Sequence, residues 1–325
     1  TKYDYYLVIE YASKLEDETG ENKNKERNII KCTPGIDKRC QTYYASVGMY
    51  GKSQEKKQKL SEYVISQYNG VQGTNNIYHH DGTLENGIND GSYRYAGASD
   101  AVKNFVCFGI NEVPCPADNL YRIIGVFEDK VKLIKSTSVG DKQWNSTKDN
   151  TWSDSSLNTY LNNEFITTFD ETTKGKIAET TWKVGGNTDD NIAKQPAKTA
   201  YQNEVVQPNP GTTSNGETED NKKIGLMYAS DYGFAAAPSA WTSTLYDYDG
   251  TAIKNVNWMY MGLNEWTISR SADTSDRAFT VYVGGYVAGI GNVSRAYVVR
   301  PVFYLTSSVN YVSGSGTAAD PITIN

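Results

Sequence analysis

Five residue types are missing from the C-terminal end of this 325-residue chain. Residues 267–325 contain no Lys, Glu, Gln, Met or Trp, whereas residues 1–266 contain sixty residues of these types. A tail of average composition would hold about thirteen of them. One explanation is structural, because the tail is rich in Gly, Val and Ser and strands disfavour Lys and Glu. Tyr, Arg and Asp remain in the tail, so it keeps aromatic and charged side chains.

Other absences exclude whole classes of function. The chain has a net charge of −6 and only eight Arg, so it lacks the basic surface that nucleic acid requires. Its sequence contains no apolar run of about eighteen residues, the length that crosses a membrane. Neither a GxSxG motif nor a phosphate-binding glycine loop is present. Nothing in the spacing of the 38 Asp and Glu marks a catalytic pair. We therefore expect a protein that is not an enzyme and holds no cofactor.

The four cysteines form two local pairs. Cys32 and Cys40 bracket TPGIDKR, and Cys107 and Cys115 bracket FGINEVP. Each intervening segment contains Pro and Gly, which favour a turn that brings its ends together. Two such loops predict two disulfides and an extracellular or cell-surface location. Reduced thiols are the alternative. A metal site is not expected, because its ligands usually come as closely spaced pairs such as CxxC.

The chain divides into two predicted regions of mixed α and β character. Residues 1–98 include a helix expected near 54–68, with Leu60, Val64 and Tyr68 on one face. A segment dense in Gly, Asn and Asp follows this helix and predicts turns or a linker. Residues 99–325 are expected to form a separate α+β domain. The role of residues 1–98 is left open.

Three elements are predicted inside the second region. NLYRIIGVFEDKVKLIK (119–135) indicates a β-hairpin that turns at Glu128 and Asp129. TWSDSSLNTYLNNEF (151–165) indicates a helix capped by Ser153 or Ser155, with Trp152 packed on the same core. KIGLMYASDYGFA (223–235) is expected to be a buried strand-like run.

The order of four segments resembles a known family. EWTISR (265–270), followed by VVRPVFYL (298–305), resembles the end of C-type-lectin-like domains of the formylglycine-generating-enzyme type. TWSDSSLNTYLNNEF and KIGLMYASDYGF are similar to segments of uncharacterised bacterial surface proteins with the same ending. The resemblance covers roughly residues 99–325 and implies a C-type-lectin-like fold. The catalytic members of that fold need cysteines in the C-terminal half, and none follows Cys115 here.

The resemblance also offers a second explanation of the depleted tail. One subset of this family comprises the variable proteins of diversity-generating retroelements, in which AAY codons near the 3′ end of the gene become NNY. NNY codons cannot encode Lys, Glu, Gln, Met or Trp. The resemblance therefore implies a diversified segment near 271–298, although the depletion continues beyond the VRP motif to Asn325, where this family does not vary. The structural explanation stays open.

The expected variable segment has the character of a binding surface. Phe279, Val281, Val287 and Val293 recur like fixed strand residues, so the positions between them should face solvent, Thr280 and Tyr282 included. Tyr and Arg dominate binding hot spots, and Ser and Asn supply adaptable polar contacts. The candidate ligand-binding residues are Ser271, Asp273, Ser275, Arg277, Thr280, Tyr282, Val283, Tyr286, Ala288, Ile290, Asn292, Ser294, Arg295 and Tyr297.

Other residues near this segment are expected to be structural. Arg300 should pair with a carboxylate or a carbonyl group, for which Asp231 is a candidate, and Pro301 should lie at an edge or a strand start. Trp258 and Trp266 should fill the core.

The resulting hypothesis is a surface-displayed or secreted binding protein of a bacterium or phage. Its ligand would be a protein or a glycan on another cell or particle. A fixed-sequence carbohydrate-binding or adhesin module and a structural surface or fibre component are the alternatives.

Overall fold

The computed structural model describes residues 57–110, 112–208 and 216–325. The described residues belong to one compact unit, Lys57–Asn325. The predicted Cys32–Cys40 pair lies outside the described residues. Within this unit no break occurs at residue 98, where we expected a domain boundary, because strands on both sides of this position pair in one sheet.

The first sheet has seven antiparallel strands. Its order is β1-β2-β4-β5-β15-β10, and β3 pairs with the same strand, β4, as β2 does. The strands are β1 (Ile77–His79), β2 (Tyr93–Tyr95), β3 (Phe105–Cys107), β4 (Leu120–Phe127), β5 (Lys130–Lys135), β10 (Ile224–Gly225) and β15 (Val302–Tyr304). The predicted hairpin is confirmed as β4 and β5. Glu128 has a left-handed backbone in its turn, with φ of 57°.

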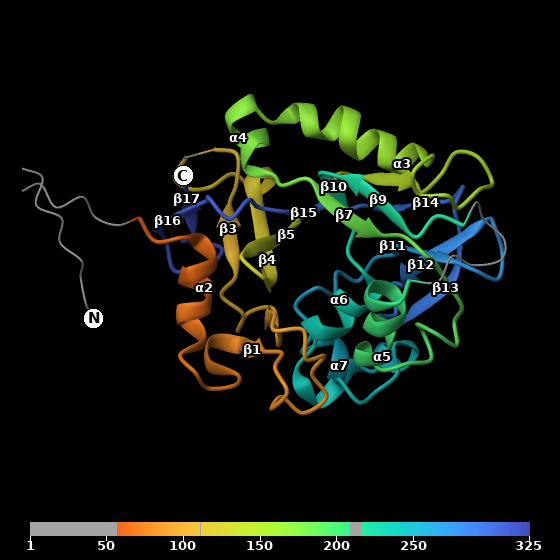
Figure 1. Cartoon of the computed structure of the whole chain (residues 1–325), viewed down its shortest axis with the longest axis horizontal. Coiled ribbons are helices and arrows are strands. Elements are labelled where there is room, and N and C mark those ends of the chain that lie inside the picture. Colours follow the sequence, from red (N-terminus) through yellow and green to blue (C-terminus); the bar gives the residue numbers. More distant parts are fainter. Residues whose placement is uncertain (1–56, 111, 209–215) are drawn as a thin grey trace, which may run out of the picture. The chain divides into compact units, whose positions relative to one another are not determined.

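The second sheet has six strands and carries the C-terminal candidate residues. Its order is β13-β12-β11-β14-β6, and β8 pairs with β11. These strands are β6 (Asp141–Gln143), β8 (Gly186–Asn187), β11 (Glu265–Ser271), β12 (Arg277–Val281), β13 (Val287–Asn292) and β14 (Ala296–Val298). Two small ribbons pair β7 (Thr180–Lys183) with β9 (Glu219–Lys222), and β16 (Tyr311–Ser313) with β17 (Thr323–Ile324). The second sheet lies away from helix α2 (Leu60–Tyr68), at the opposite side of the unit (Figure 1).

Short helices connect these strands. They are α3 (Ser156–Thr159), α4 (Glu171–Lys176), α5 (Ala197–Tyr201), α6 (Ala229–Ala235) and α7 (Thr251–Lys254). Ser155 caps α3 by accepting a hydrogen bond from the Asn158 amide at 3.0 Å, as predicted. The helix continues through irregular turns to Thr168, and Trp152 is buried beside it. The unit therefore has the expected α+β architecture, and helix α2 is confirmed within the predicted range.

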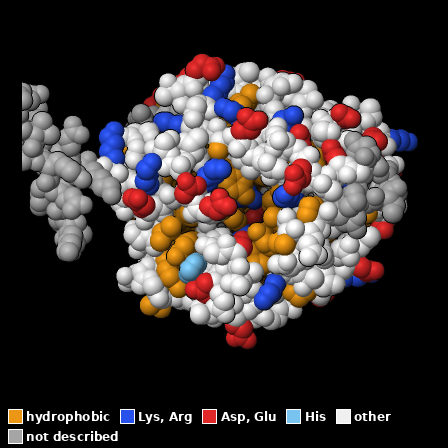
Figure 2. Space-filling model, viewed as in Figure 1, with side chains coloured by type: hydrophobic (Ala, Val, Ile, Leu, Met, Phe, Trp, Pro, Cys, Tyr) orange, Lys and Arg blue, Asp and Glu red, His pale blue; other side chains and the backbone are white. Residues whose placement is uncertain are grey.

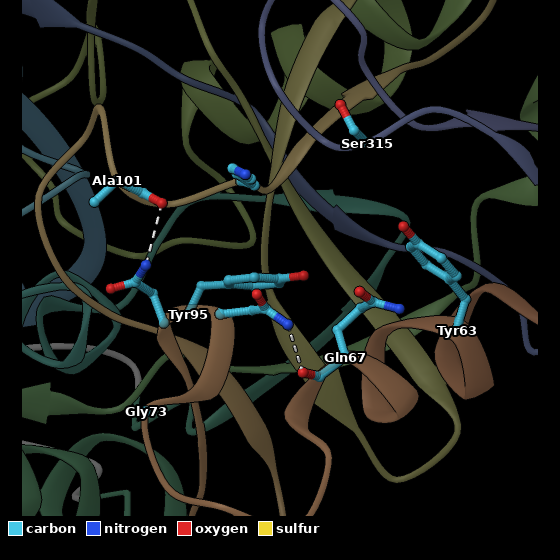
Figure 3. Close-up of a pocket in the computed structure, with 9 residues that line it drawn as sticks. Tyr63, Gln67, Gly73, Tyr95, Ala101 and Ser315 are labelled. Atoms are coloured by element: carbon cyan, nitrogen blue, oxygen red, sulfur yellow. Dashed lines mark hydrogen bonds between the residues drawn. The ribbon is translucent and has the colours of Figure 1, made fainter.

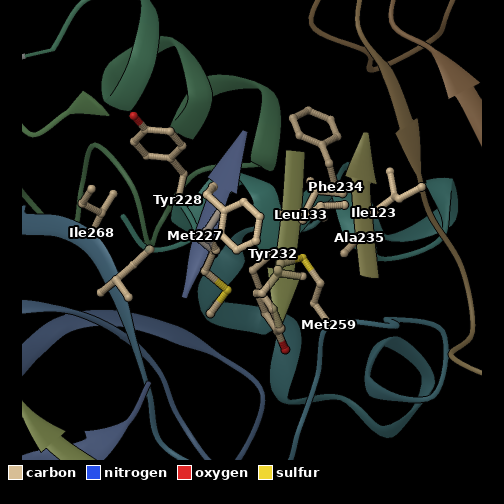
Figure 4. Packing of buried hydrophobic residues seen from close by; sticks show 14 of the residues in the cluster. Ile123, Leu133, Met227, Tyr228, Tyr232, Phe234, Ala235, Met259 and Ile268 are labelled. Carbon is tan, nitrogen blue, oxygen red and sulfur yellow. The ribbon is translucent and has the colours of Figure 1, made fainter. Parts of the chain in front are cut away.

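Helix α6 packs between the two sheets. Figure 4 shows its side chains beside Ile123 and Leu133 of the first sheet and Ile268 of the second. The Ile268 amide donates to the Met227 carbonyl at 3.0 Å, which ties β11 to the start of this helix. We expected residues 223–235 to be strand-like throughout, but only Ile224–Gly225 are. Every residue of α6 is buried, so the segment lacks the one-sided apolar pattern that distinguishes a surface helix.

Buried charges link distant parts of the chain. Asp231 accepts hydrogen bonds from Lys132 Nζ at 2.5 Å and from Arg94 Nη1 at 3.4 Å, and Arg94 also pairs with Asp90. The expected Asp231–Arg300 pair is therefore wrong. Arg300 pairs with Glu265 instead, at 2.6 and 2.8 Å, and both side chains are buried. Arg300 therefore has a carboxylate partner, as predicted, but the partner is Glu265.

Two further expectations are confirmed among the described residues. Cys107 and Cys115 form a disulfide. Trp258 and Trp266 are both buried in the core. The same residues include no helix with the length and apolar character needed to cross a bilayer.

Candidate functional site

Seven of the candidate binding residues line one open depression in the second sheet. They are Arg277, Tyr282, Ile290, Asn292, Ser294, Arg295 and Tyr297, and the depression has a volume of about 530 Å³. Lys148 also lines it, although this residue was not among the candidates predicted from sequence. Lys148 lies in the loop after β6, far along the chain from the other residues, and no feature of its local sequence marks it.

Strand pairing brings the lining residues together. Arg277 begins β12 and lies directly opposite Asn292 at the end of β13. Tyr297 is in β14, which pairs with β6 and so brings the loop that contains Lys148 near the same place. Ser294 and Arg295 lie in the short turn between β13 and β14. Residues of β12, β13 and β14 therefore line the depression together with the β13–β14 turn and the loop that contains Lys148.

Asn292 fixes the shape of the turn at the rim. Its side-chain nitrogen donates to Asp276 Oδ2 at 3.1 Å, and its side-chain oxygen accepts from the Ser294 amide and hydroxyl at 3.1 and 2.7 Å. The Arg295 amide donates to the Asn292 carbonyl at 2.9 Å. This network holds the backbone that presents the Arg295 side chain, which is exposed.

All charged residues that line the depression are cations. Arg277 has one acidic neighbour, Asp276, whose carboxylate lies 3.9 Å from Arg277 Nε. Within the described part of the chain, neither Lys148 nor Arg295 has a carboxylate at ion-pair distance. Figure 2 shows acidic and basic side chains interspersed on the face in view, whereas the charged residues that line the depression are all cations.

Tyrosine rings form the apolar part of the depression. The Tyr297 ring lies 4.7 Å from the buried Trp266 ring. Tyr282 stacks on Tyr286 with ring centroids 4.9 Å apart. The ring centroids of Tyr286 and Tyr246 are 5.4 Å apart. Burial raises the pKa of Tyr282, and the neighbouring phenols of Tyr297 and Tyr286 raise it further. Tyr282 therefore stays protonated at neutral pH and can donate a hydrogen bond.

Three candidate residues are buried and cannot contact a ligand at the surface. Ser271, Thr280 and Ala288 are each less than 4% exposed, and Thr280 is fully buried. Thr280 was expected to face solvent as the neighbour of core residues. Instead, Trp266 lies directly opposite Thr280 in the β11–β12 pairing and covers that face of the strand. A side chain added at Gly291 would collide with both Thr280 and Trp266, so the covering is tight.

The remaining candidates lie outside the depression. Val283 is exposed at the tip of the β12–β13 hairpin, and Tyr286 lies at the base of this tip, stacked on Tyr282. Asp273 is exposed and Ser275 is half-buried, both in the loop between β11 and β12. These four residues are accessible but do not share the depression with the cations.

The depression offers binding chemistry. Its lining contains guanidinium, ammonium, phenol, amide and hydroxyl donors, and it contains no carboxylate, imidazole or thiol. Across the described residues no three His, Cys, Asp or Glu side chains lie together as metal ligands do. The arrangement can therefore hold an anion or a polar group through several donors at once.

Comparison with known proteins identifies a family. A family model described as a domain of unknown function (DUF6273) matches residues 128–307, which include every strand that lines the depression. No curated protein and no solved structure matches the chain.

Proposed function

Because the chain belongs to the family of the domain of unknown function DUF6273, whose description names no activity, we propose a function from the geometry of the depression. The protein is a surface-displayed or secreted binding protein, and the depression receives its ligand. One observation carries the proposal: seven residues selected from sequence as ligand contacts line a single open depression of about 530 Å³. That volume lies within the range of about 300–1,000 Å³ typical of ligand sites.

The ligand of the depression is anionic. Lys148, Arg277 and Arg295 surround it. The carboxylate of Asp276 lies 3.9 Å from Arg277 Nε and outside the lining. Arg binds carboxylate, sulfate and phosphate groups through two parallel hydrogen bonds. Tyr282 and Tyr297 add aromatic area at low cost in side-chain entropy. An acidic or sulfated glycan and an acidic protein segment both fit this chemistry, and they are the ligand sources to compare.

We further propose a C-type-lectin-like fold whose exposed face is diversified by a retroelement. Accessibility along residues 271–298 supports this proposal. The positions assigned to the framework, including Phe279, Val281, Val287 and Val293, are all buried. Most positions assigned to variation are exposed or half-buried. Lys148 lies outside the segment, and NNY codons cannot encode Lys, so this cation would remain constant while its neighbours change.

Sequencing the gene in many cells of one population tests diversification. We expect variation at the accessible candidates, such as Arg277, Ile290 and Arg295, and constancy at the buried candidates Ser271, Thr280 and Ala288. A nearby reverse transcriptase gene with a near-copy of the segment is expected as well. Identical sequences across 271–298 would leave a fixed-sequence adhesin as the better explanation.

Ligand class is tested separately from diversification. An array that carries sulfated glycans, carboxylated glycans, neutral glycans and acidic peptides should capture the protein on one anionic class. Capture should weaken as salt concentration rises, because solvent-exposed charges are screened within about 10 Å at 0.1 M salt. A structural surface or fibre component is the alternative, and self-assembly of the chain without capture of any array member would favour it.

A further inference from the structure

A second, chemically different pocket lies at the other side of the unit. Its volume is about 340 Å³, and it shares no residue with the depression. Figure 3 shows Tyr63 and Gln67 of helix α2 and Tyr95 of strand β2 around this space, with Ser315 of the loop before β17 at its border. The residues that line it are Tyr63, Gln67, Gly73, Asn75, Asn76, Tyr95, Ala101, Lys103 and Ser315.

Tyr95 places an unused hydroxyl group in this pocket. The side chain is only 3% exposed, yet its hydroxyl has no hydrogen-bond partner among the described residues. The hydroxyl therefore meets the open space of the pocket, where a bound molecule can form a hydrogen bond with it. Burial raises the pKa of Tyr95, so the hydroxyl keeps its proton and can donate as well as accept.

The asparagines on the pocket wall have a left-handed backbone. Asn75 and Asn76 are consecutive residues with φ values of 54° and 60°, a conformation that Asn adopts more readily than most residues other than Gly. Their side-chain nitrogens donate to the carbonyl groups of Gln67, at 2.8 Å, and Ala101, at 3.1 Å. Each amide is therefore fixed through its nitrogen. In the described part of the chain neither amide oxygen accepts a hydrogen bond.

Tyr63 forms a rigid aromatic wall. Its ring stacks on Tyr311 with centroids 3.7 Å apart, and its hydroxyl donates to the Gly314 carbonyl at 3.4 Å. Burial raises the pKa of Tyr63 to about 12, and the nearby phenol of Tyr311 contributes. The ring is therefore held in place by stacking, and its hydroxyl stays protonated.

The lining selects a neutral ligand with several hydroxyl groups. It has no carboxylate and a single cation, the exposed Lys103. Its amides, phenols and hydroxyl both donate and accept, as sugar hydroxyls do. A volume near the lower end of ligand pockets fits one small molecule. We propose that this pocket binds a single neutral sugar residue. The site does not depend on the depression or its function.

Saturation-transfer NMR on the full chain tests the proposal. The probes are the methyl glycosides of glucose, galactose, mannose and N-acetylglucosamine. At least one glycoside should bind saturably, and Tyr95→Phe should weaken its binding by about 5–10-fold, the effect of one lost hydrogen bond. Tyr95→Phe should melt like the unmodified protein, because its hydroxyl makes no bond inside the described residues. Tyr246→Phe, which removes an exposed phenol beside Tyr286, is the matched control and should leave binding unchanged.

A second variant tests the pocket at a residue other than Tyr95. Asn75→Gly removes an amide acceptor while it keeps the left-handed backbone accessible, and it should also weaken binding. Two results would overturn the proposal. One is the absence of binding by every glycoside at concentrations on the order of 10 mM, which corresponds to less than about 3 kcal/mol of affinity. The other is binding that Tyr95→Phe does not change.

Discussion

Replacement of Trp266 by Ala tests how the second sheet supports the depression. The indole is about 1% exposed, lies opposite Thr280 in the strand pairing and contacts the Tyr297 ring at 4.7 Å. Its Nε1 donates to the Lys142 carbonyl of β6 at 2.9 Å. One side chain therefore joins β11, β12, β14 and β6. Truncation removes this packing and leaves the Lys142 carbonyl without its partner.

The expected loss follows from these contacts. Truncation of a buried Trp or Phe to Ala costs about 3–5 kcal/mol, and the unpaired carbonyl adds about 1 kcal/mol. In a unit of this size each kcal/mol lowers the melting temperature by about 2–4 °C, so the total of about 4–6 kcal/mol predicts a fall of roughly 8–24 °C. Trp266→Phe keeps most of the packing and loses the hydrogen bond, so it should cost about 1–2 kcal/mol.

Thermal melts and urea unfolding of both variants provide the measurement. Trp266→Ala should unfold well below Trp266→Phe, which should in turn unfold slightly below the unmodified protein. An unchanged midpoint for Trp266→Ala would place the indole at the surface. It would also refute coverage by this indole as the reason that Thr280 is buried.

Two further predictions concern buried charge. Arg300→Met should destabilise the unit by about 3–5 kcal/mol in urea unfolding, because it leaves the Glu265 carboxylate buried without a cation. Adding Glu265→Gln should restore part of this lost stability. Equal stability of the single and double variants would contradict a direct pair. Burial raises the pKa of Glu204 above its ordinary 4.5, against the opposing hydrogen bonds from Ser269, Ser230 and Ala229, so its favourable contribution is complete below pH 4.5 and is lost as pH rises through the folded-state pKa. The free energy of unfolding of Glu204→Gln, relative to the unmodified protein, should therefore increase as pH rises above 4.5. A difference that does not change with pH would contradict the raised pKa.

Local sequence patterns predicted the elements whose signals are local. The hairpin β4–β5 follows from two β-branched runs around Glu128 and Asp129, and the Ser155 cap follows from a polar residue ahead of a helical face. Helix α6 was missed because all its residues are buried, so apolar periodicity could not separate helix from strand.

The site shows the same division between local and long-range information. Arg277, Ile290 and Asn292 were selected for side chains suited to contact between the expected core residues, and all three are accessible. Alternation from Phe279 and Val281 predicted instead that Thr280 and Tyr282 face solvent. It failed at Thr280, because alternation gives the two faces of a strand but not which of them another element covers. Lys148 could not be found from sequence, since only the pairing of β6 with β14 brings its loop to the depression.

Buried ion pairs depend on tertiary choices of partner. Asp231 and Arg300 were both expected to be structural, and each has a buried ion pair, but with Lys132 and Glu265 respectively. Charge complementarity alone does not select among several acids and bases of one chain. The topology of the two sheets makes that selection.

The most direct test of the binding function compares two triple-alanine variants with the same change in net charge. The first replaces Lys148, Arg277 and Arg295, the exposed cations of the depression. The second replaces Lys57, Lys194 and Lys198, which are exposed elsewhere. Both should unfold normally, since an exposed substitution usually changes stability by less than about 0.5 kcal/mol.

Capture on the anionic array member that the unmodified protein binds best is then measured for both variants. We expect the depression variant to lose at least about 2 kcal/mol of binding free energy, roughly thirtyfold in affinity, as hot-spot truncations do. The control variant should bind almost as well as the unmodified protein. Equal loss in the two variants, or full capture by the depression variant, would show that the depression is not the ligand site.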